Sequence, residues 1–271
     1  MKTRILTAAV ALPLLLIVVL ACPVWATAIL VAAASAYAVY ELLFAAGLFR
    51  HLRVIVWTAA AAVSVSLWCG FGMPYIWGLV IVWGYLLLLF SEFLFAKTQM
   101  GFSRLCTAVF AGLVLPFCLS ALTRVVAMQM GRYYVIAVLI MTFSADTGAY
   151  FIGVRFGRHK LAPVVSPHKT VEGLLGGVAS SVLAMLLYCL VLQLAFGRSV
   201  DYLSGIIYGV FGALAGTLGD LAFSTIKRQS GIKDFGTLLP GHGGVLDRLD
   251  SMTMTAPAAE LLILLLPLIV K

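Results

Sequence analysis

Long apolar stretches separated by short polar segments dominate this chain of 271 residues. A helix needs roughly 17 to 25 mostly apolar residues to cross a hydrocarbon core of about 30 Å, and the chain offers about nine stretches of that kind. The pattern predicts transmembrane helices at residues 5–21, 25–44, 54–69, 75–96, 105–123, 133–153, 174–196, 202–223 and 252–270. The first stretch also has the basic start of a signal peptide, so its retention stays open.

The composition supports a membrane protein. Hydrophobic residues make up 63% of the chain, charged residues make up 10%, and the mean hydropathy is +1.12. Such a chain has too little polar surface to fold as a soluble globule. We therefore predict an all-α fold, that of a polytopic integral membrane protein. We divide it into N-terminal transmembrane helices at 1–132 and a C-terminal region at 133–271, where the polar motifs gather.

The positions of lysine and arginine predict the orientation, because cytoplasmic loops retain positive charge. With the N-terminus in the cytoplasm, all but four of the 18 basic residues fall on the cytoplasmic side. The four exceptions are Arg124, Arg132, Arg198 and Lys271. The net charge of +8 then lies mostly on one membrane face, where anionic lipid headgroups or a polyphosphate are the expected partners. Nucleic acid is not expected, because the sequence contains no basic domain that could follow a groove.

Two aspartates inside predicted helices are candidates for a functional site, because ionisable residues in a bilayer are costly. Asp146 lies between small residues in the segment FSADTGAYFIG. Asp220 lies in GTLGDLAFSTIKR, where Ser224, Lys227 and Arg228 follow at i+4, i+7 and i+8. This spacing places all four of these polar residues on one face of a helix.

Two glutamates are interpreted differently. Glu41 and Glu92 lie near the predicted cytoplasmic ends of their helices, where a charged side chain reaches the membrane interface at little cost. We therefore assign them a structural role at the interface.

Two predicted cytoplasmic loops carry most of the remaining charge. The first, RFGRHKLAPVVSPHKTVEG, contains Lys169 and Glu172. The second includes LPGHGGVLDRLDS, whose glycines let backbone amides approach a ligand. Asp247 and Asp250 lie three residues apart there and can share one helix face. Because Mg²⁺ binds one or two carboxylates together with phosphate oxygens, this loop predicts a metal and polyphosphate site at the membrane surface.

Two simpler interpretations stay open at this point. The basic loops can serve only to bind anionic lipids, with the aspartates neutralising them. A membrane ion or solute transporter would use Asp146 and Asp220 as ion sites within the bilayer. The concentration of charge on one face, rather than at the midplane of two related halves, weighs against a transporter.

The run STIKRQSGIKDFGTLLPGHGGVLDRLDS, residues 224–251, resembles the signature of the phosphatidate cytidylyltransferase (CDP-diglyceride synthase) family. The shared pattern is Ser-x-x-Lys-Arg, four residues, Lys-Asp, and then Pro-x-His-Gly-Gly-x-x-Asp-Arg-x-Asp. Upstream, SADTGAYFIG and SPHKTVEG also resemble the family, whereas the first half agrees only in being a series of apolar helices. One departure is His168, where the family pattern leads us to expect a lysine.

The resemblance implies a nucleotidyltransferase that converts CTP and phosphatidic acid to CDP-diacylglycerol and pyrophosphate in phospholipid biosynthesis. It implies Mg²⁺ as the cofactor, and a second metal ion is left open. The expected location is a bacterial-type cytoplasmic (inner) membrane, with active-site loops facing the cytoplasm. The expected partners are CTP, phosphatidic acid and the lipid bilayer, and a homodimer is left open.

The resemblance also implies roles for individual residues. Those expected to bind metal are Asp146, Asp220, Asp247 and Asp250, and for Asp146 a role in the polarity of the site stays open. Those expected to stabilise the reacting phosphates as catalytic residues are Lys227, Arg228, Lys233, Asp234, His242 and Arg248. Those expected to bind substrate are Lys169, Glu172, Ser224, Gly243 and Gly244. For His242, a phosphate contact and a role in holding the loop together stay equally open.

A CTP-dependent lipid kinase is the nearest enzymatic alternative, because it needs similar cations but transfers the γ-phosphoryl group. The products separate the two enzymes, since the kinase releases CDP and the cytidylyltransferase forms a CDP-lipid. A CDP-alcohol phosphotransferase is disfavoured, because its Asp-Gly-x-x-Ala-Arg pattern does not occur in the sequence.

Overall fold

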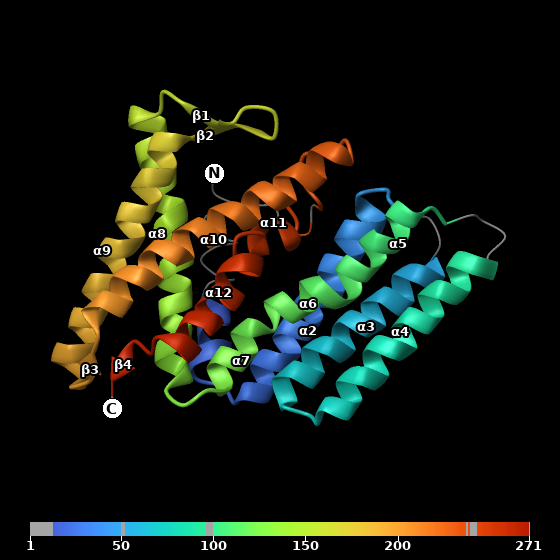
Figure 1. Cartoon of the computed structure of the whole chain (residues 1–271), viewed down its shortest axis with the longest axis horizontal. Coiled ribbons are helices and arrows are strands. Elements are labelled where there is room, and N and C mark those ends of the chain that lie inside the picture. Colours follow the sequence, from blue (N-terminus) through green and yellow to red (C-terminus); the bar gives the residue numbers. More distant parts are fainter. Residues whose placement is uncertain (1–12, 50–51, 96–99, 237, 239–242, 271) are drawn as a thin grey trace. The chain divides into compact units, whose positions relative to one another are not determined.

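The computed structural model describes residues 13–49, 52–95, 100–236, 238 and 243–270. Helices account for most of them, as expected of an all-α protein (Figure 1). The chain forms two compact units, and each unit is assembled from two separate segments. Unit 1 comprises Met1–Met128 and Gln229–Leu249, and unit 2 comprises Gln129–Arg228 and Asp250–Lys271.

Unit 1 is a bundle in which α3 packs against both α2 and α4 (Figure 1). Two of its elements, η1 and η2, are single π-helical turns that continue the preceding α-helix. Its elements are α2 (Val24–Tyr40), η1 (Glu41–Ala45), α3 (Leu52–Phe71), α4 (Tyr75–Phe95), α5 (Phe102–Val109), η2 (Phe110–Val114), α6 (Leu115–Leu119), α7 (Ala121–Ala127) and α11 (Leu246–Leu249).

A tyrosine ties three helices of unit 1 together. Tyr85 Oη in α4 lies 2.8 Å from the carbonyl oxygen of Ala108 in α5 and 2.9 Å from Thr58 Oγ1 in α3. Gly112 permits this approach, because a Cβ at that position would overlap the tyrosine ring. Such polar links between helices satisfy groups that have no access to water inside a bilayer.

Unit 2 is built around a long helical hairpin, α8 and α9 (Figure 1). A short antiparallel hairpin joins these helices and pairs Lys160 with Thr170 and Ala162 with Ser166. At the other end of α9, β3 pairs antiparallel with β4. The elements are α8 (Gly131–Phe156), β1 (Lys160–Ala162), β2 (Ser166–Thr170), α9 (Val171–Phe196), β3 (Ser199–Val200), α10 (Tyr202–Gln229), α12 (Met252–Leu265) and β4 (Ile269–Val270).

Small residues allow the helices of unit 2 to pack closely. A Cβ at Gly176 in α9 would lie 2.5 Å from Ile152 in α8. In α10, a Cβ at Gly209 would lie 2.6 Å from the α9 backbone at Val182. Glycine at these positions removes the side chain that would hold the helices apart, which is a common way for membrane helices to associate.

Seven described helices are long and apolar enough to cross a membrane. Each coincides with a predicted transmembrane helix, and together they confirm the polytopic all-α fold. The seven cover residues 24–44, 52–71, 75–95, 102–127, 131–156, 171–196 and 202–229. The first predicted helix, 5–21, begins outside the described residues, and its described part is helical at 13–20.

The last predicted transmembrane helix, 252–270, is wrong as a continuous helix. α12 ends at Leu265 after 14 residues. Its length of about 21 Å falls short of a hydrocarbon core of about 30 Å. Pro267 explains the end, because the residue before a proline avoids the helical conformation, and Leu266 has φ −138° and ψ 75°. The chain then continues into β4.

We expect Gly177→Leu to destabilise unit 2, because a Cβ at this position of α9 would lie 2.8 Å from the carbonyl oxygen of Ala145 in α8. Overpacking of this kind costs about 1–3 kcal/mol. The measurement is the midpoint temperature for loss of the monodisperse peak of detergent-solubilised protein after heating. Gly84→Leu is the control, because nothing lies within 4 Å of a Cβ there. Equal midpoints for the two variants would contradict the close packing of α8 on α9.

Candidate functional site

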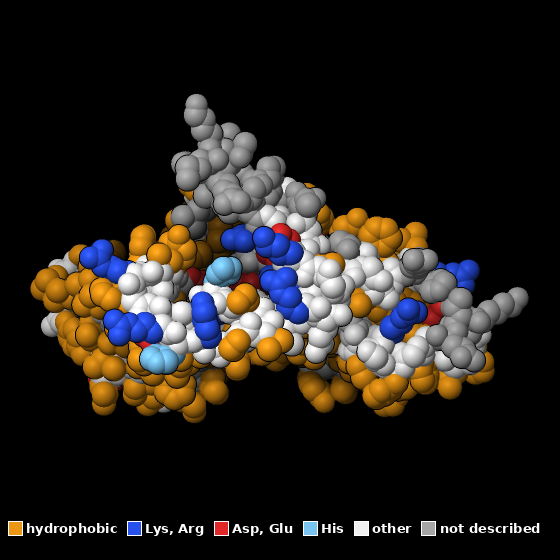
Figure 2. Space-filling view, turned by 90° about the horizontal axis from the view of Figure 1, so that it is seen from above, with side chains coloured by type: hydrophobic (Ala, Val, Ile, Leu, Met, Phe, Trp, Pro, Cys, Tyr) orange, Lys and Arg blue, Asp and Glu red, His pale blue; other side chains and the backbone are white. Residues whose placement is uncertain are grey.

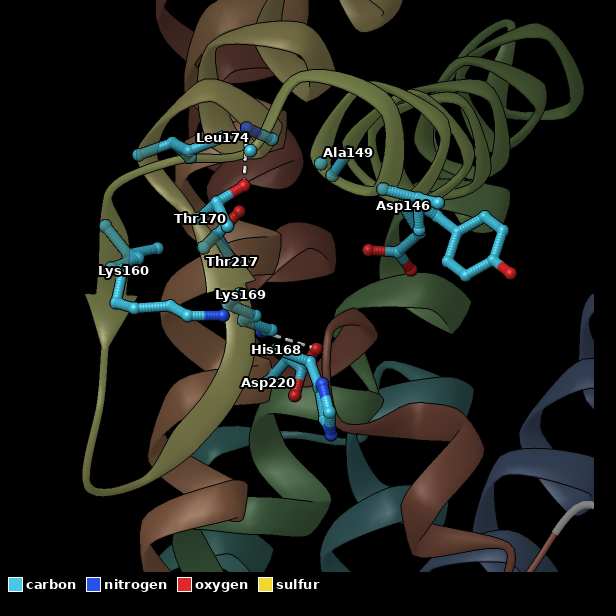
Figure 3. Close-up of a pocket in the computed structure, with 15 residues that line it drawn as sticks. Asp146, Ala149, Lys160, His168, Lys169, Thr170, Leu174, Thr217 and Asp220 are labelled. Atoms are coloured by element: carbon cyan, nitrogen blue, oxygen red, sulfur yellow. Dashed lines mark hydrogen bonds and ion pairs between the residues drawn. The ribbon is translucent and has the colours of Figure 1, made fainter.

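A cavity of about 610 Å³ lies in unit 2 and is lined by α8, the β1–β2 hairpin, α9 and α10 (Figure 3). Basic and acidic side chains share its walls. The lining residues with a carboxylate, an ammonium group or an imidazole ring are Asp146, Lys160, His168, Lys169 and Asp220. The hairpin supplies the basic ones because it connects the end of α8 to the start of α9 at the cavity mouth. The cavity therefore offers both cationic groups for an anionic ligand and carboxylates for a cation.

An ion pair fixes the centre of the cavity. Lys169 Nζ lies 2.6 Å from Asp220 Oδ2, and the two side chains are 25% and 29% exposed (Figure 3). Ser224 donates from Oγ to Asp220 Oδ1 at 3.1 Å, which agrees with the predicted polar face of α10. Asp220 is thus held by one partner from β2 and by another one turn along its own helix.

Asp250 is a second carboxylate of unit 2, and Asp220 acts on it. It occupies the turn just before α12. Burial, followed by repulsion from the Asp220 carboxylate, raises the pKa of Asp250 to about 7, and Lys227 opposes this shift. Asp146 in α8 raises the same pKa further, though by less. Two other predicted metal-binding aspartates of unit 2 therefore act on Asp250.

The donor set of unit 2 fits a magnesium ion that is shared with a ligand. The repulsion between Asp220 and Asp250 is of the kind that a divalent cation relieves, and Mg²⁺ takes one or two carboxylates plus phosphate oxygens and water. Among the residues that the structure describes, no three His, Cys, Asp or Glu side chains are placed to hold a metal ion by themselves. The remaining ligands would have to come from substrate and water.

The side chain of Glu172 holds the hairpin in place by binding backbone amides of the loop after α8. Its carboxylate accepts hydrogen bonds from the amides of Arg158 at 3.0 Å and His159 at 3.2 Å, and it lies 2.6 Å from Nδ1 of His159. The sequence had predicted a substrate contact for this residue, and in the structure its contacts are to the loop after α8. Thr170 adds a cap at the start of α9, where its Oγ1 accepts from the amide of Gly173 at 3.1 Å.

The signature loop in unit 1 is organised by Asp247, which is only 6% exposed. Its Oδ2 accepts hydrogen bonds from the amides of Phe235 and Gly244, each at 2.9 Å. Gly243 has φ +85°, a left-handed conformation that favours glycine. The predicted substrate-binding glycines are thus part of a tight turn that folds back onto Asp247.

The interpretation of Glu41 as an interfacial residue is wrong, because its side chain is 0% exposed. Its Oε1 accepts a hydrogen bond from the amide of Val245 at 3.0 Å, and its Oε2 accepts one from the amide of Leu246 at 2.7 Å. These partners lie more than 200 positions away in the sequence, so no local pattern pointed to them.

The other predicted site residues are distributed over both units. Lys227 and Arg228 lie in the last turn of α10, and Arg228 Nε donates to the carbonyl oxygen of Val165 at 3.4 Å. In unit 1, Lys233, Asp234 and Arg248 are exposed. His242 lies outside the described residues. Within unit 2, Figure 2 shows Lys and Arg side chains on the face that carries the β1–β2 hairpin.

Sequence reasoning did not single out Lys160 for the site. In the structure its side chain extends into the cavity from β1, near Lys169 (Figure 3). The strand pairing agrees with this, because Lys160 lies opposite Thr170, which also lines the cavity. A hairpin prediction for residues 160–170 would have found it.

The fold and the site together define a polytopic helical membrane protein with a charged cavity beside its apolar helices. The chain belongs to the cytidylyltransferase family, whose model matches residues 2–266. This match includes both units and the whole of the signature at 224–251.

Curated relatives are similar over a shorter stretch. A phosphatidate cytidylyltransferase of Bacillus subtilis is 40% identical over 129 residues, which cover 48% of this chain and 46% of the relative. One of Staphylococcus aureus is 42% identical over 137 residues, 49% of this chain and 50% of the relative. One of Staphylococcus epidermidis is 40% identical over 134 residues, again 49% and 50%. The chain thus spans about half the length of the curated relatives it matches.

We expect Glu172→Ala to speed tryptic cleavage after Arg158 and Lys160 several-fold, because the amides of Arg158 and His159 lose the carboxylate that holds this loop. The measurement is the rate at which the corresponding fragments form from detergent-solubilised protein. Glu92→Ala is the control, because Glu92 lies in α4 of unit 1. Unchanged cleavage rates in the Glu172 variant would show that the hairpin does not depend on this carboxylate.

Proposed function

We propose that the protein is a phosphatidate cytidylyltransferase, which joins CTP to phosphatidic acid, forms CDP-diacylglycerol and releases pyrophosphate. The observation that carries the proposal is the Lys169–Asp220 pair in a charged cavity of a chain that belongs to the cytidylyltransferase family. The printed names of the curated relatives support the choice of lipid substrate.

The reaction requires two anions to approach each other. An oxygen of the phosphatidic acid phosphate attacks the α-phosphorus of CTP, and the bond from that phosphorus to the bridging oxygen breaks. The electron pair of that bond leaves with pyrophosphate. Because a phosphate monoester has a second pKa of about 6, the nucleophile is already an anion near neutral pH and needs no base. Positioning and charge neutralisation therefore account for most of the catalysis.

The cavity residues suit this task. Lys160 and Lys169 extend into the cavity, where their ammonium groups would bind phosphate oxygens (Figure 3). Asp220 orients Lys169 through the ion pair. His168, at the position where a lysine was expected, also lines the cavity and brings an imidazole ring to it.

We propose Mg²⁺ as the cofactor, held by Asp220 and Asp250 in unit 2. When bound, it would supply positive charge to the phosphates that react. The metal roles of Asp146 and Asp247 stay predictions, and so do a second metal ion and a homodimer. Asp146 lines the cavity, and Asp247 binds amides of the signature loop.

We propose that the protein lies in a bacterial-type cytoplasmic membrane with the cavity facing the cytoplasm. The support is the positive-inside rule applied to α9. The loop before this helix carries Arg158, Lys160 and Lys169, and Arg155 lies next to it in the last turn of α8, whereas the loop after α9 carries Arg198.

The decisive experiment is the conversion of radiolabelled CTP and phosphatidic acid by purified protein in detergent with Mg²⁺. We expect CDP-diacylglycerol, and we expect Asp220→Asn and Asp250→Asn each to lower kcat by about 100-fold or more, with strongly non-additive losses in the double variant. Asp201→Asn is the control, because Asp201 caps the far end of α10 and asparagine caps equally well. Release of CDP with a phosphorylated lipid would instead identify a lipid kinase, and additive losses would contradict a shared metal.

The orientation is tested by single cysteines in a background without the five native ones. A cysteine at Val164, which is 89% exposed, should react with a membrane-impermeant maleimide only in inverted membrane vesicles. A cysteine at Ser199 should react only in right-side-out vesicles. The opposite pattern would reverse the proposed topology.

A further inference from the structure

The buried carboxylate of Glu41 is the strongest unexplained feature of unit 1. It lies at the first residue of the π-helical turn η1, inside a helix that is long and apolar enough to cross a membrane. Its side chain is 0% exposed. An unpaired carboxylate at such a place would cost several kcal/mol, so its partners define its role.

Those partners are backbone amides of the signature loop. The two carboxylate oxygens bind separate and consecutive donors, the amides of Val245 and Leu246, at 3.0 and 2.7 Å. Hydrogen bonds from amides to an ionised group are among the stronger ones in proteins. Because both oxygens are used on neighbouring residues, Glu41 fixes the direction of the backbone there as well as its position.

Asp247 binds the same loop through different amides. Its Oδ2 accepts from Phe235 and Gly244, which come before the residues that Glu41 binds. Two carboxylates therefore hold four amides in the segment between Phe235 and Leu246. Glu41 is the one of the two that lies outside the signature.

Two glycines of the loop make room for Glu41. A Cβ added at Gly236 or at Gly244 would overlap the Glu41 carboxylate. Gly244 belongs to the signature, where we had expected it to approach substrate, and in the structure it also approaches this glutamate. The loop is thus shaped around the Glu41 side chain at two separate positions.

We propose that Glu41 is a positioning residue of the active site, which holds the signature loop in the conformation that the reaction needs. The proposal rests on the proposed cytidylyltransferase activity and adds to it a role for the N-terminal half of the chain. Glu41 acts through the backbone of residues 245–246 and does not need to touch substrate.

The contact is tested by hydrogen exchange of detergent-solubilised full-length protein. Glu41→Gln keeps the volume of the side chain but replaces one acceptor oxygen with a donor, and Glu41→Leu removes both acceptors. We expect exchange at the amides of residues 245 and 246 to rise about 10- to 100-fold, with unchanged exchange in α8 and α9. Glu92→Gln is the control. Unchanged exchange at 245 and 246 in both Glu41 variants would overturn the proposal.

The catalytic effect is tested by steady-state kinetics. The measured rates are divided by the amount of folded protein, which is the fraction with wild-type hydrogen exchange in α8 and α9. We expect kcat to fall about 10-fold in Glu41→Gln and about 100-fold in Glu41→Leu, because small displacements of a catalytic group are costly. The KM for phosphatidic acid should change less than about threefold, because the cavity of unit 2 is intact. Faster exchange at 245 and 246 with a wild-type kcat would assign Glu41 to folding alone and overturn the positioning role.

A pair of compensating substitutions tests the contact even where a single variant folds poorly. Gly236→Ala adds a methyl group that overlaps the Glu41 carboxylate, and Glu41→Asp withdraws that carboxylate by one methylene. We expect each change alone to lower kcat about tenfold or more and the double variant to lose less than the two combined. Gly84→Ala in α4 is the matched control, because a Cβ there meets nothing within 4 Å. Fully additive losses would overturn the proposal.

The two proposals fail in different ways. If the wild-type protein makes no CDP-diacylglycerol, the proposed function fails, and the catalytic role of Glu41 fails with it even where exchange confirms the contact. If the wild type is active and the Glu41 and Gly236 variants are equally active, only the positioning role fails.

Discussion

The cost of removing a carboxylate from water governs where this protein places its charge. Only 10% of the residues are charged, and those that enter the helical core bring partners with them. Asp220 is paired with Lys169 and Ser224, and Glu41 with two amides. Asp250 has a raised pKa because burial and its neighbour Asp220 both disfavour its charge. A cation bound beside Asp250 would oppose both of these effects.

Close helix packing makes these pairings possible. The hairpin that carries Lys169 is positioned by α8 and α9, which can approach each other because glycines face the partner helix. Glu172 and Thr170 then fix the hairpin at the start of α9. The Lys169–Asp220 distance therefore depends on the packing of α8 against α9 and on hydrogen bonds from backbone amides to Glu172 and Thr170.

Much of the architecture could be predicted from the sequence, because a bilayer imposes long apolar helices and the described helices agree with that pattern. The end of α12 was not predicted, since apolar residues continue beyond Leu265 and hydropathy does not register the effect of Pro267 on the residue before it. Within the site, the i, i+4 spacing correctly brought Ser224 to Asp220. Glu41 could not be predicted, because its partners lie 204 and 205 positions away and are backbone amides, which are the same for every residue type except proline.

The discontinuity of unit 1 also has a consequence for synthesis. Its first segment ends at Met128, but its second begins at Gln229, after most of unit 2. Glu41 and Val245 are 204 positions apart. At about 5–20 residues per second, a ribosome takes roughly 10–40 s to make that stretch. During this interval the Glu41 carboxylate has none of its native partners, so water, lipid headgroups or the insertion machinery must solvate it until the signature loop has been made.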